Sequence, residues 1–537
     1  MAGKISRRRF LATTSAATAG GLLALRCGGG GGGGGGTQTT GKPTLGPVKR
    51  GGTYHLGSSI TALTIDPHTE MTMGLAFTPY IYGYLFHQIQ QQDGGAPLVV
   101  NDHAETLEQP DPLTYIFKLH PGIHFQDLPP VNGRELVADD VIYSFKRIAG
   151  GDSTAFWKTG IAEMTAPDPR TFSVRITDPY AYVMGEFGDV HTAIVPHEAV
   201  EEWGDLKHNG LGSGPFQVRS LSQTEGIVMD RNPNYFVEGI PYLDSLSWRI
   251  IADDSSLQAA FKAKQLDVYS PPTRPQAESV AAISDHVLVS KDPSLAITMI
   301  NLNEIKAPIL QDERVREAMD IALDRDAIIK KLCFGEGNFT GPVSWGLSFW
   351  SLPQDELRQR LARDLPKARQ LLEQAGATDL SLTIKCRSDG ADVATMVKEQ
   401  MAEAGININI VTQELGAWVN ALFEQDFELM VGSGLPYADE HLPIQFNHTL
   451  NWTRKADPVQ LPDPPIDAEL DQVLVTVDPY ERQKLVLDVT RKILDRHGPF
   501  LYLYAPYGYT ARWDYLRGYE DVPAAMIAYT YGMWLDK

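Results

Sequence analysis

The chain has 537 residues, of which 67 are Asp or Glu and 47 are Lys or Arg, so its formal net charge at pH 7 is −20. This acidic balance argues against nucleic acid as a partner and against broad binding to anionic lipid. The hydrophobic fraction of 43% is ordinary for a globular protein, and the length exceeds what one core accommodates, so two or three domains are expected.

The first 27 residues predict an export signal. A basic start precedes an apolar stretch over residues 10–25, which is too short to span a bilayer. The run SRRRFL resembles the twin-arginine signal, which exports proteins that are already folded, with Arg7 and Arg8 as its arginine pair. An ordinary basic start is the alternative.

Cys27 closes this apolar stretch, in the place where bacterial lipoproteins carry the cysteine that becomes lipidated. Arg26 stands where a small residue is expected, and a cut after residues 17–19 would leave Cys27 free in a flexible tail. Nine glycines follow, and residues 28–47 would span roughly 25 Å as a random coil. We therefore expect residues 1–27 to be a signal ending at an anchor cysteine and residues 28–47 to be a tether.

The body alternates between strand and helix periods. Residues 113–125 carry β-branched and aromatic runs around a Pro-Gly turn, which predicts a hairpin. Asp139 and Asp140 can cap a helix that buries Val141, Phe145 and Ile148.

The later part of the chain predicts an α/β lobe. A helix is expected over residues 315–322, a second after a cap at Asp324, and a third that ends at Gly376. The alternating strands 380–386 and 406–410 flank a helix over 393–404, and this spacing is typical of a βαβ unit. Asp478-Pro479 predicts the start of a last helix.

Short catalytic motifs are missing from the sequence, which has no Gly-x-Ser-x-Gly, phosphate-binding loop or His-Glu-x-x-His. His120 and His124 lie across a turn and are expected to be surface polar groups rather than metal ligands. Cys333 and Cys386 belong to no Cys-x-x-Cys pair, and two free core thiols are expected rather than one disulfide. No cofactor, metal or enzymatic activity is predicted.

Five segments, in order, resemble the family 5 extracytoplasmic solute-binding proteins of ATP-binding-cassette (ABC) importers. These are the peptide and nickel receptors that deliver their cargo to a membrane permease. The matching segments are KRGGTYHLG through TIDPHT, LTYIFKLHPGIHFQD through NGRELVADDVIYSFKRI, GSGPFQV, NPNYFVEGIPYLDSLSWRII and ERVREAMDIALDRDAII.

The resemblance implies a type II periplasmic-binding-protein fold, an α/β architecture with two hinged lobes and an extra subdomain. The expected boundaries are lobe I at 48–82, 178–292 and 501–537, a subdomain at 83–177, and lobe II at 293–500. The family closes its lobes on a ligand, so we expect capture of a peptide or similar solute by a monomer outside the cytoplasm, in the periplasm or at the cell surface.

The resemblance also implies site residues. In peptide-binding members a buried aspartate meets the α-ammonium of the peptide, and Asp439 stands in that place here, with Tyr437 beside it. A desolvated ammonium needs a carboxylate partner; the alternative is that Asp439 caps a short helix. Leu435-Pro436 departs from the family's Gly-Trp, and the strand before it carries no arginine for a ligand carboxylate.

Weaker candidates lie in three other segments. Trp418 could wall the pocket or fill the core of lobe II. Trp345 and Trp350 lie in a loop that the family places near the mouth of the cleft. The loop after DPH, with Thr69, Glu70 and Met71, touches ligand in several members.

Two other functions stay open from the sequence. A receptor for a metal or metal chelate is compatible with export in a folded state, but no His/Met cluster supports it. A sensory or assembly protein without transport, or an enzyme on this fold, is the third possibility.

Overall fold

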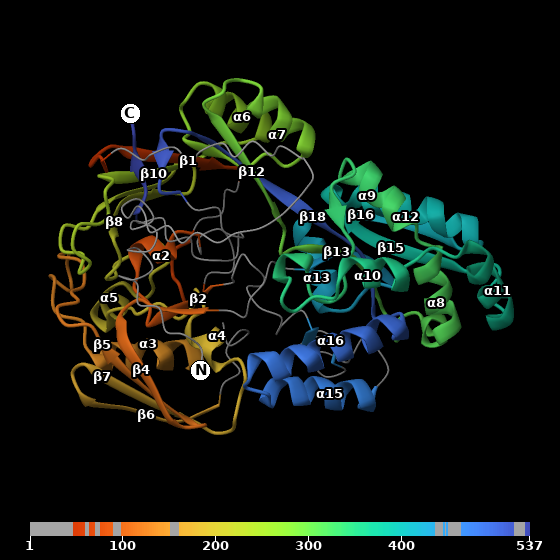
Figure 1. Cartoon of the computed structure of the whole chain (residues 1–537), viewed down its shortest axis with the longest axis horizontal. Helices are drawn as coiled ribbons and strands as arrows, with labels where there is room; N and C mark the ends of the chain where they lie inside the picture. Colours follow the sequence, from red (N-terminus) through yellow and green to blue (C-terminus); the bar gives the residue numbers. More distant parts are fainter. Residues whose placement is uncertain are drawn as a thin grey trace, which may run out of the picture.

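The computed structural model describes residues 47–59, 64–69, 76–89, 98–150, 160–434, 444–445, 447–448, 463–519 and 532–537. These residues form two α/β lobes side by side, joined by two strands that cross between them (Figure 1). The fold class expected from the sequence is confirmed, whereas the residue boundaries of the lobes stay predictions.

Lobe I is built on a four-stranded sheet in the order β1-β10-β9-β8. The strands are β1 (Thr53–Ser58), β10 (Ser245–Ile250), β9 (Gly226–Arg231) and β8 (Phe216–Ser222). Leu246 and Trp248 of β10 are buried in the core of the lobe, and the alternation along the strand sends Ser247 and Arg249 to the opposite face. Around this sheet lie α2 (Thr78–Ile81), β2 (Phe86–Ile89), β3 (Leu98–Asn101), α4 (Val183–Phe187), α5 (His197–Trp203), α6 (Asp254–Lys262), β11 (Val268–Tyr269), α7 (Arg274–Ala281), β19 (Leu516–Arg517) and β20 (Trp534–Leu535).

A second antiparallel sheet forms the subdomain, with α3 (Ala138–Gly150) packed on it. Its strands are β4 (Ala104–Asp111), β5 (Thr114–Leu119), β7 (Thr171–Ile176) and β6 (Ile161–Asp168). As predicted, Val141, Phe145 and Ile148 are the buried face of α3.

The hairpin predicted over residues 113–125 is wrong. β5 pairs with β4 and β7, and after the turn only an isolated bridge joins His124 to Glu135. Ile123 and Phe125 are buried in the core, and their backbone groups bond residues 134–136 instead of returning to β5.

Lobe II contains the sheet order β13-β17-β15-β16. Its strands are β13 (Ile297–Leu302), β17 (Leu429–Gly434), β15 (Ser381–Arg387) and β16 (Asn407–Gln413). The predicted βαβ unit is confirmed, since β15 and β16 are parallel and α12 (Ala391–Ala404) connects them. Gly376 and Gly405 end α11 (Leu365–Ala375) and α12 with φ of +69° and +96°, which is why glycine stands at both positions.

The other elements of lobe II surround this sheet. They are η2 (Pro308–Gln311), α8 (Glu313–Ala322), α9 (Arg325–Leu332), β14 (Gly337–Asn338), η3 (Trp345–Leu347), α10 (Gln354–Arg360), η4 (Ser388–Gly390), α13 (Leu415–Phe423), α15 (Pro464–Val475) and α16 (Pro479–Arg496). The caps predicted at Asp324 and Asp478 are confirmed, because Asp324 accepts a hydrogen bond from Ala327 N and Asp478 accepts from Tyr480 N and Glu481 N. Asp139 and Asp140 lie instead inside the first turn of α3, which begins at Ala138.

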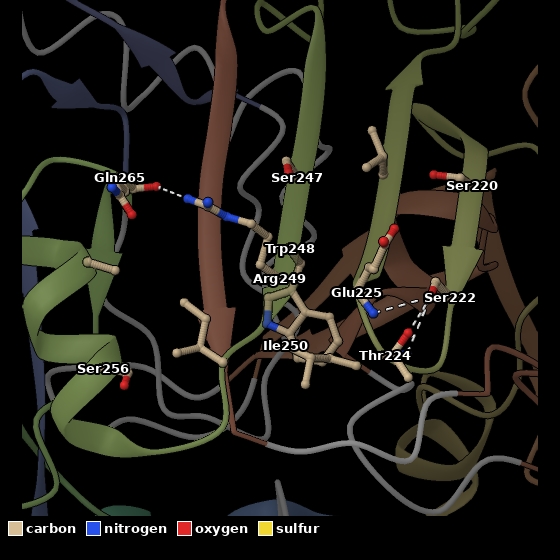
Figure 2. Close-up of a pocket in the computed structure, with 14 residues that line it drawn as sticks. Ser220, Ser222, Thr224, Glu225, Ser247, Trp248, Arg249, Ile250, Ser256 and Gln265 are labelled. Atoms are coloured by element: carbon tan, nitrogen blue, oxygen red, sulfur yellow. Dashed lines mark hydrogen bonds between the residues drawn. The ribbon is translucent and has the colours of Figure 1, made fainter.

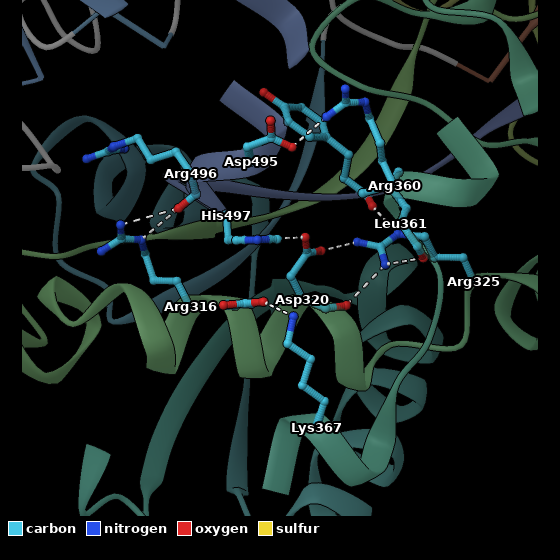
Figure 3. A network of polar contacts seen from close by, with 11 residues as sticks. Arg316, Asp320, Arg325, Arg360, Leu361, Lys367, Asp495, Arg496 and His497 are labelled. Atoms are coloured by element: carbon cyan, nitrogen blue, oxygen red, sulfur yellow. Dashed lines mark hydrogen bonds and ion pairs between the residues drawn. The ribbon is translucent and has the colours of Figure 1, made fainter. Parts of the chain in front are cut away.

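A buried ionic network joins α8 to α9 and to the end of α16 (Figure 3). Asp320 pairs with Arg325, and its other carboxylate oxygen lies 2.7 Å from His497 Nδ1. Arg325 also donates to the carbonyl of Tyr502, at 2.7 Å. Asp320 and Arg325 belong to the ERVREAMDIALDRDAII stretch, so charged residues of this stretch connect α8 and α9 to the end of α16 and to β18.

The two crossing strands are β12 (Val287–Pro293) and β18 (Phe500–Trp513). Residues 500–504 of β18 pair with β13, and residues 507–513 pair with β12, so one strand belongs to both lobes. Lys291 stands opposite Tyr509 in this ladder, and Glu336 accepts a hydrogen bond from Tyr509 Oη and lies 3.0 Å from Lys291 Nζ. These contacts tie lobe II to the crossing strands.

Candidate functional site

The parallel strands of lobe II bring three carboxyl ends to one edge of the sheet. β15 runs parallel to β16 and to β17, so Arg387, Gln413 and Gly434 end their strands on the same side. β13 is antiparallel and starts there, with Ile297 opposite Gly434, and three residues separate β13 from the end of the crossing strand β12. Ligands of open α/β sheets bind outside the carboxyl ends of the strands, and this edge lies beside the junction of the lobes.

Arg387 supplies a positive charge at this edge. Its side chain is 41% exposed and pairs with Asp389, and its guanidinium carbon lies 5.9 Å from the centre of the Trp418 ring. Arg387 was not predicted from the sequence, because the expected place for such an arginine was the strand before Asp439 and not the neighbouring strand β15. Its position directly after the alternating strand was the available signal.

α13 presents apolar side chains that the core does not cover. Leu415 is 58% exposed, whereas Trp418 is half-buried and packs against Ala421, Phe427 and Met430. Among the described residues, the buried Trp418 Nε1 has no hydrogen-bond partner. Trp418 thus fills a small core and borders the edge, and its role as a wall of the ligand pocket stays a prediction.

The loop carrying Trp345 and Trp350 lies against the end of β12. Ser344 Oγ donates to the carbonyl of Ser294 at 2.6 Å, and a Cβ on Gly346 would lie 2.8–3.0 Å from Leu295 and from the carbonyls of Pro293 and Ser294. Trp345 is half-buried at the start of η3. Trp350 has 0% exposure, so in this conformation its indole has no free face for a solute.

The TIDPHT segment of lobe I is an anchored turn. Asp66 is fully buried, binds both Nη atoms of Arg147 and accepts from Leu206 N at 3.1 Å. Burial raises the pKa of Asp66, but the hydrogen bonds and charge of Arg147 outweigh it and hold the pKa below its ordinary value. Burial, and then Arg147, lower the pKa of His68 to about 4, so its imidazole is neutral and bonds the carbonyl of Ala193. Thr69 is exposed immediately after this turn.

Several predicted residues lie outside the described residues. They are Asp439, Tyr437, Glu70, Met71, Cys27, Arg7 and Arg8. The segment with Tyr437 and Asp439 follows directly after Gly434, and the one with Glu70 and Met71 directly after Thr69. Their roles stay predictions.

A polar pocket of about 710 Å³ lies elsewhere, between the outer face of the β10-β9-β8 sheet and α6 (Figure 2). Its polar lining is rich in hydroxyl groups, from Ser220, Ser222, Thr224, Ser247 and Ser256. Arg249 also lines it and donates to the carbonyl of Gln265 at 2.5 Å. None of the residues predicted from the sequence lines this pocket.

The described residues provide no group of three or more His, Cys, Asp or Glu side chains suited to a metal ion. Cys333 and Cys386 are free thiols, as predicted, and burial raises the pKa of Cys333 to about 11, which keeps that thiol protonated. In the same part of the chain, no helix has the length and hydropathy needed to span a bilayer.

Comparison with known proteins identifies the family and the fold. The family described as bacterial extracellular solute-binding proteins, family 5, middle region, matches residues 99–451. A glutathione-binding protein GsiB of Salmonella paratyphi A is 25% identical over 87% of this chain and 91% of its own length. An oligopeptide-binding protein AppA of Bacillus subtilis is 25% identical over 81% of this chain and 83% of its own length.

Among solved structures, a periplasmic binding protein DppA of Helicobacter pylori, in complex with the peptide STSA, superposes with a TM-score of 0.75. The alignment covers 91% of this chain and 99% of that protein at 21% identity, which establishes the shared fold.

Proposed function

Because this chain belongs to family 5 of the bacterial extracellular solute-binding proteins, we propose that it captures a peptide or similar small solute between its lobes for an ABC importer. The observation that carries the proposal is the family match together with the edge where three strands of lobe II end beside the crossing strands. Relatives named for glutathione and oligopeptides favour a peptide-like ligand over other solutes.

Two charges of opposite sign would recognise the two ends of a peptide. Asp439 would pair with the α-ammonium, and Arg387 would pair with a carboxylate of the ligand. Charge-assisted hydrogen bonds of this kind are worth about 1.5–3 kcal/mol each. Trp418 and Leu415 of α13 would supply an apolar wall that tolerates different side chains.

Closure of the lobes would follow from binding at this place. A ligand bound at the edge of lobe II lies next to β12 and β18, so contacts with both lobes form only when the lobes approach. The closed form, with its ligand, would then be what the permease recognises.

Calorimetric titration with defined peptides tests the recognition. Tri-alanine is compared with its N-acetylated and C-amidated forms, and glutathione is titrated as a second probe. Asp439→Asn should weaken binding of tri-alanine at least tenfold and leave binding of the N-acetylated form unchanged. Arg387→Gln should weaken binding of tri-alanine at least tenfold and leave binding of the C-amidated form unchanged. Asp379→Asn, which removes an exposed carboxylate of the same lobe, is the control and should change nothing.

Native mass spectrometry of freshly purified protein would identify a retained ligand directly. A retained peptide would support the proposal. A bound metal chelate, or turnover of any added peptide, would contradict it.

The N-terminal segment would hold the body at a membrane. Acyl chains on Cys27 would supply the affinity, two or more being needed for a stable anchor, and the glycines would let the body reach its permease. Cys27→Ala should move the protein from the membrane fraction to the soluble extracytoplasmic fraction, and replacing Arg7 and Arg8 with lysine should block export. Unchanged fractionation of both variants would refute the anchor and the twin-arginine route.

A further inference from the structure

The lobes touch at a second place, away from the crossing strands. The backbone N–H of Ala181, just before α4 of lobe I, donates to the carbonyl of Leu474 in α15 of lobe II at 2.7 Å. Figure 1 shows α4 beside the ends of α15 and α16, on the side of the molecule opposite β12 and β18. The lobes are thus joined covalently on one side and by side chains and a backbone hydrogen bond on the other.

Arg482 of α16 is the centre of this second contact. Its guanidinium carbon lies 4.9 Å from the ring centre of Tyr182, just before α4, and 5.0 Å from that of Trp350. All three side chains are buried. A cation held between aromatic faces away from water makes a stronger interaction than one at an exposed site.

The guanidinium is fixed on lobe II. Arg482 Nη1 donates to the carbonyls of Thr476 and Val477, at 2.9 and 3.1 Å, which close the turn between α15 and α16. Tyr182 and Trp350 both pack in the core of lobe II. Tyr182 is followed directly by Val183, the first residue of α4, whose side chain lies in the core of lobe I, so the chain enters lobe I from this contact.

One loop connects this contact to the crossing strands. The loop 344–350 begins at Ser344, which bonds the carbonyl of Ser294 just after β12, and ends at Trp350 beside Arg482. Seven residues therefore connect the end of β12 to the Tyr182–Arg482–Trp350 contact.

We propose that Tyr182 and Arg482 form a latch, which holds the lobes closed and sets the ratio of closed to open molecules. Trp350 is the base of this latch rather than a wall of the ligand site. The proposal rests on the hinged capture proposed above and names the residues that regulate it. Because apparent affinity scales with the population of the competent form, the latch raises affinity for every ligand without touching any of them.

Distances between spin labels on the two lobes test the latch without a ligand. In the full chain, with Cys27 and Cys333 replaced by serine, labels at E163C and A468C report the separation of β6 and α15 by double electron–electron resonance. Tyr182→Leu and Arg482→Met should each lower the closed-to-open ratio about tenfold, and Tyr182→Phe, which keeps the ring, should match the parent protein.

Arg358→Met is the matched control. The guanidinium carbon of Arg358 lies 4.4 Å from the ring centre of Phe339, and both residues belong to lobe II. Thermal melting of each variant shows whether it is folded before its distances are measured. Tyr182 and Arg482 lie on different segments, so one variant still tests the latch if the other does not fold.

Both latch variants should also release tri-alanine faster. If both give the distance distribution of the parent protein, Tyr182 moves with lobe II as a static contact and the latch is refuted. Failure to bind any peptide would refute the proposed function instead, since the unliganded distances are measured independently of a ligand.

Discussion

Buried carboxylates anchor a turn of lobe I and the connection between α8 and α9 in lobe II. Asp66 and Asp320 are both buried, and each pairs with an arginine. Arg147 binds both carboxylate oxygens of Asp66, and Arg325 also donates to the backbone carbonyl of Asp320. Such a pair is weak evidence of net stabilisation, but removal of one partner leaves a charge without compensation.

Asp320→Asn should therefore cost about 3–5 kcal/mol of unfolding free energy at pH 7. Burial raises the pKa of Asp320, but Arg325 and His497 outweigh it and hold the pKa below the ordinary value of 3.8. A carboxylate with a lowered folded-state pKa stabilises above the unfolded pKa and loses this contribution as pH falls below it. Urea unfolding at several pH values checks this: the difference between wild type and variant should shrink as pH falls below about 4.

The control for this prediction is Asp326→Asn, which removes an exposed ion pair with Arg358 on the same lobe. It should cost less than about 1 kcal/mol at any pH. A loss as large as that of Asp320→Asn would show that burial does not decide the cost.

Gly83 is required by a neighbouring ring. A Cβ at this position would lie 1.8 Å from His103 Nε2, which hydrogen-bonds Ser213 Oγ at 2.7 Å in the GSGPF turn. Gly83→Ala should cost roughly 3 kcal/mol, because both groups are in a packed core, as measured by urea unfolding. Gly150→Ala meets no atom within 4 Å and should change stability by less than about 1 kcal/mol; equal effects would refute the steric reason.

At the scale of elements, α13 combines a buried side, where Ala421 packs against Phe427 and Met430, with an exposed apolar side chain, Leu415. Because Leu415 contributes little to the packing of the lobe, its apolar side chain is accessible to a ligand.

Leu415→Gln should leave the melting temperature unchanged and weaken the binding of tri-alanine about tenfold. This loss is equivalent to about 1.4 kcal/mol of lost apolar burial. Calorimetry and thermal melting measure the two effects separately. Ile309→Gln, at an exposed apolar position of η2, should change neither. Equal affinities of wild type and Leu415→Gln would remove α13 from the site.

At the scale of the molecule, each lobe has its own core, and β12 and β18 connect them. Glu336 of lobe II binds both Lys291 of β12 and Tyr509 of β18, and its carboxylate lies 3.6 Å from Arg274 of α7 in lobe I. Charged side chains from both lobes therefore meet at these strands. Rotation of the lobes must be accommodated here, because the strands are the covalent path between the cores.

A ligand at one hundred times its dissociation constant should raise the unfolding free energy by about 2.7 kcal/mol. If capture closes the lobes, small-angle scattering should show a smaller radius of gyration in the same sample. A gain in stability without compaction would support binding but contradict closure.

Local periodicity determined much of the fold. The strand, helix, strand order over residues 381–413, the caps at Asp324 and Asp478 and the stops at Gly376 and Gly405 depend on neighbours within a few residues, so the sequence alone predicts them. The motif order also predicted the family correctly. The prediction of a hairpin was wrong, because side-chain alternation does not show which segment a strand pairs with; residues 123–125 pair with residues 134–136.

Only the tertiary structure decided how the candidate residues are grouped. It brings Arg387 to Trp418, places Trp350 beneath Arg482 and shares β18 between both lobes, and none of these relations leaves a local pattern. The partners are between 31 and more than 200 residues apart, so their contacts come from sheet order and lobe packing. The sequence thus determined the elements and the class of protein, whereas packing between distant segments determined which side chains border the edge and which form the latch.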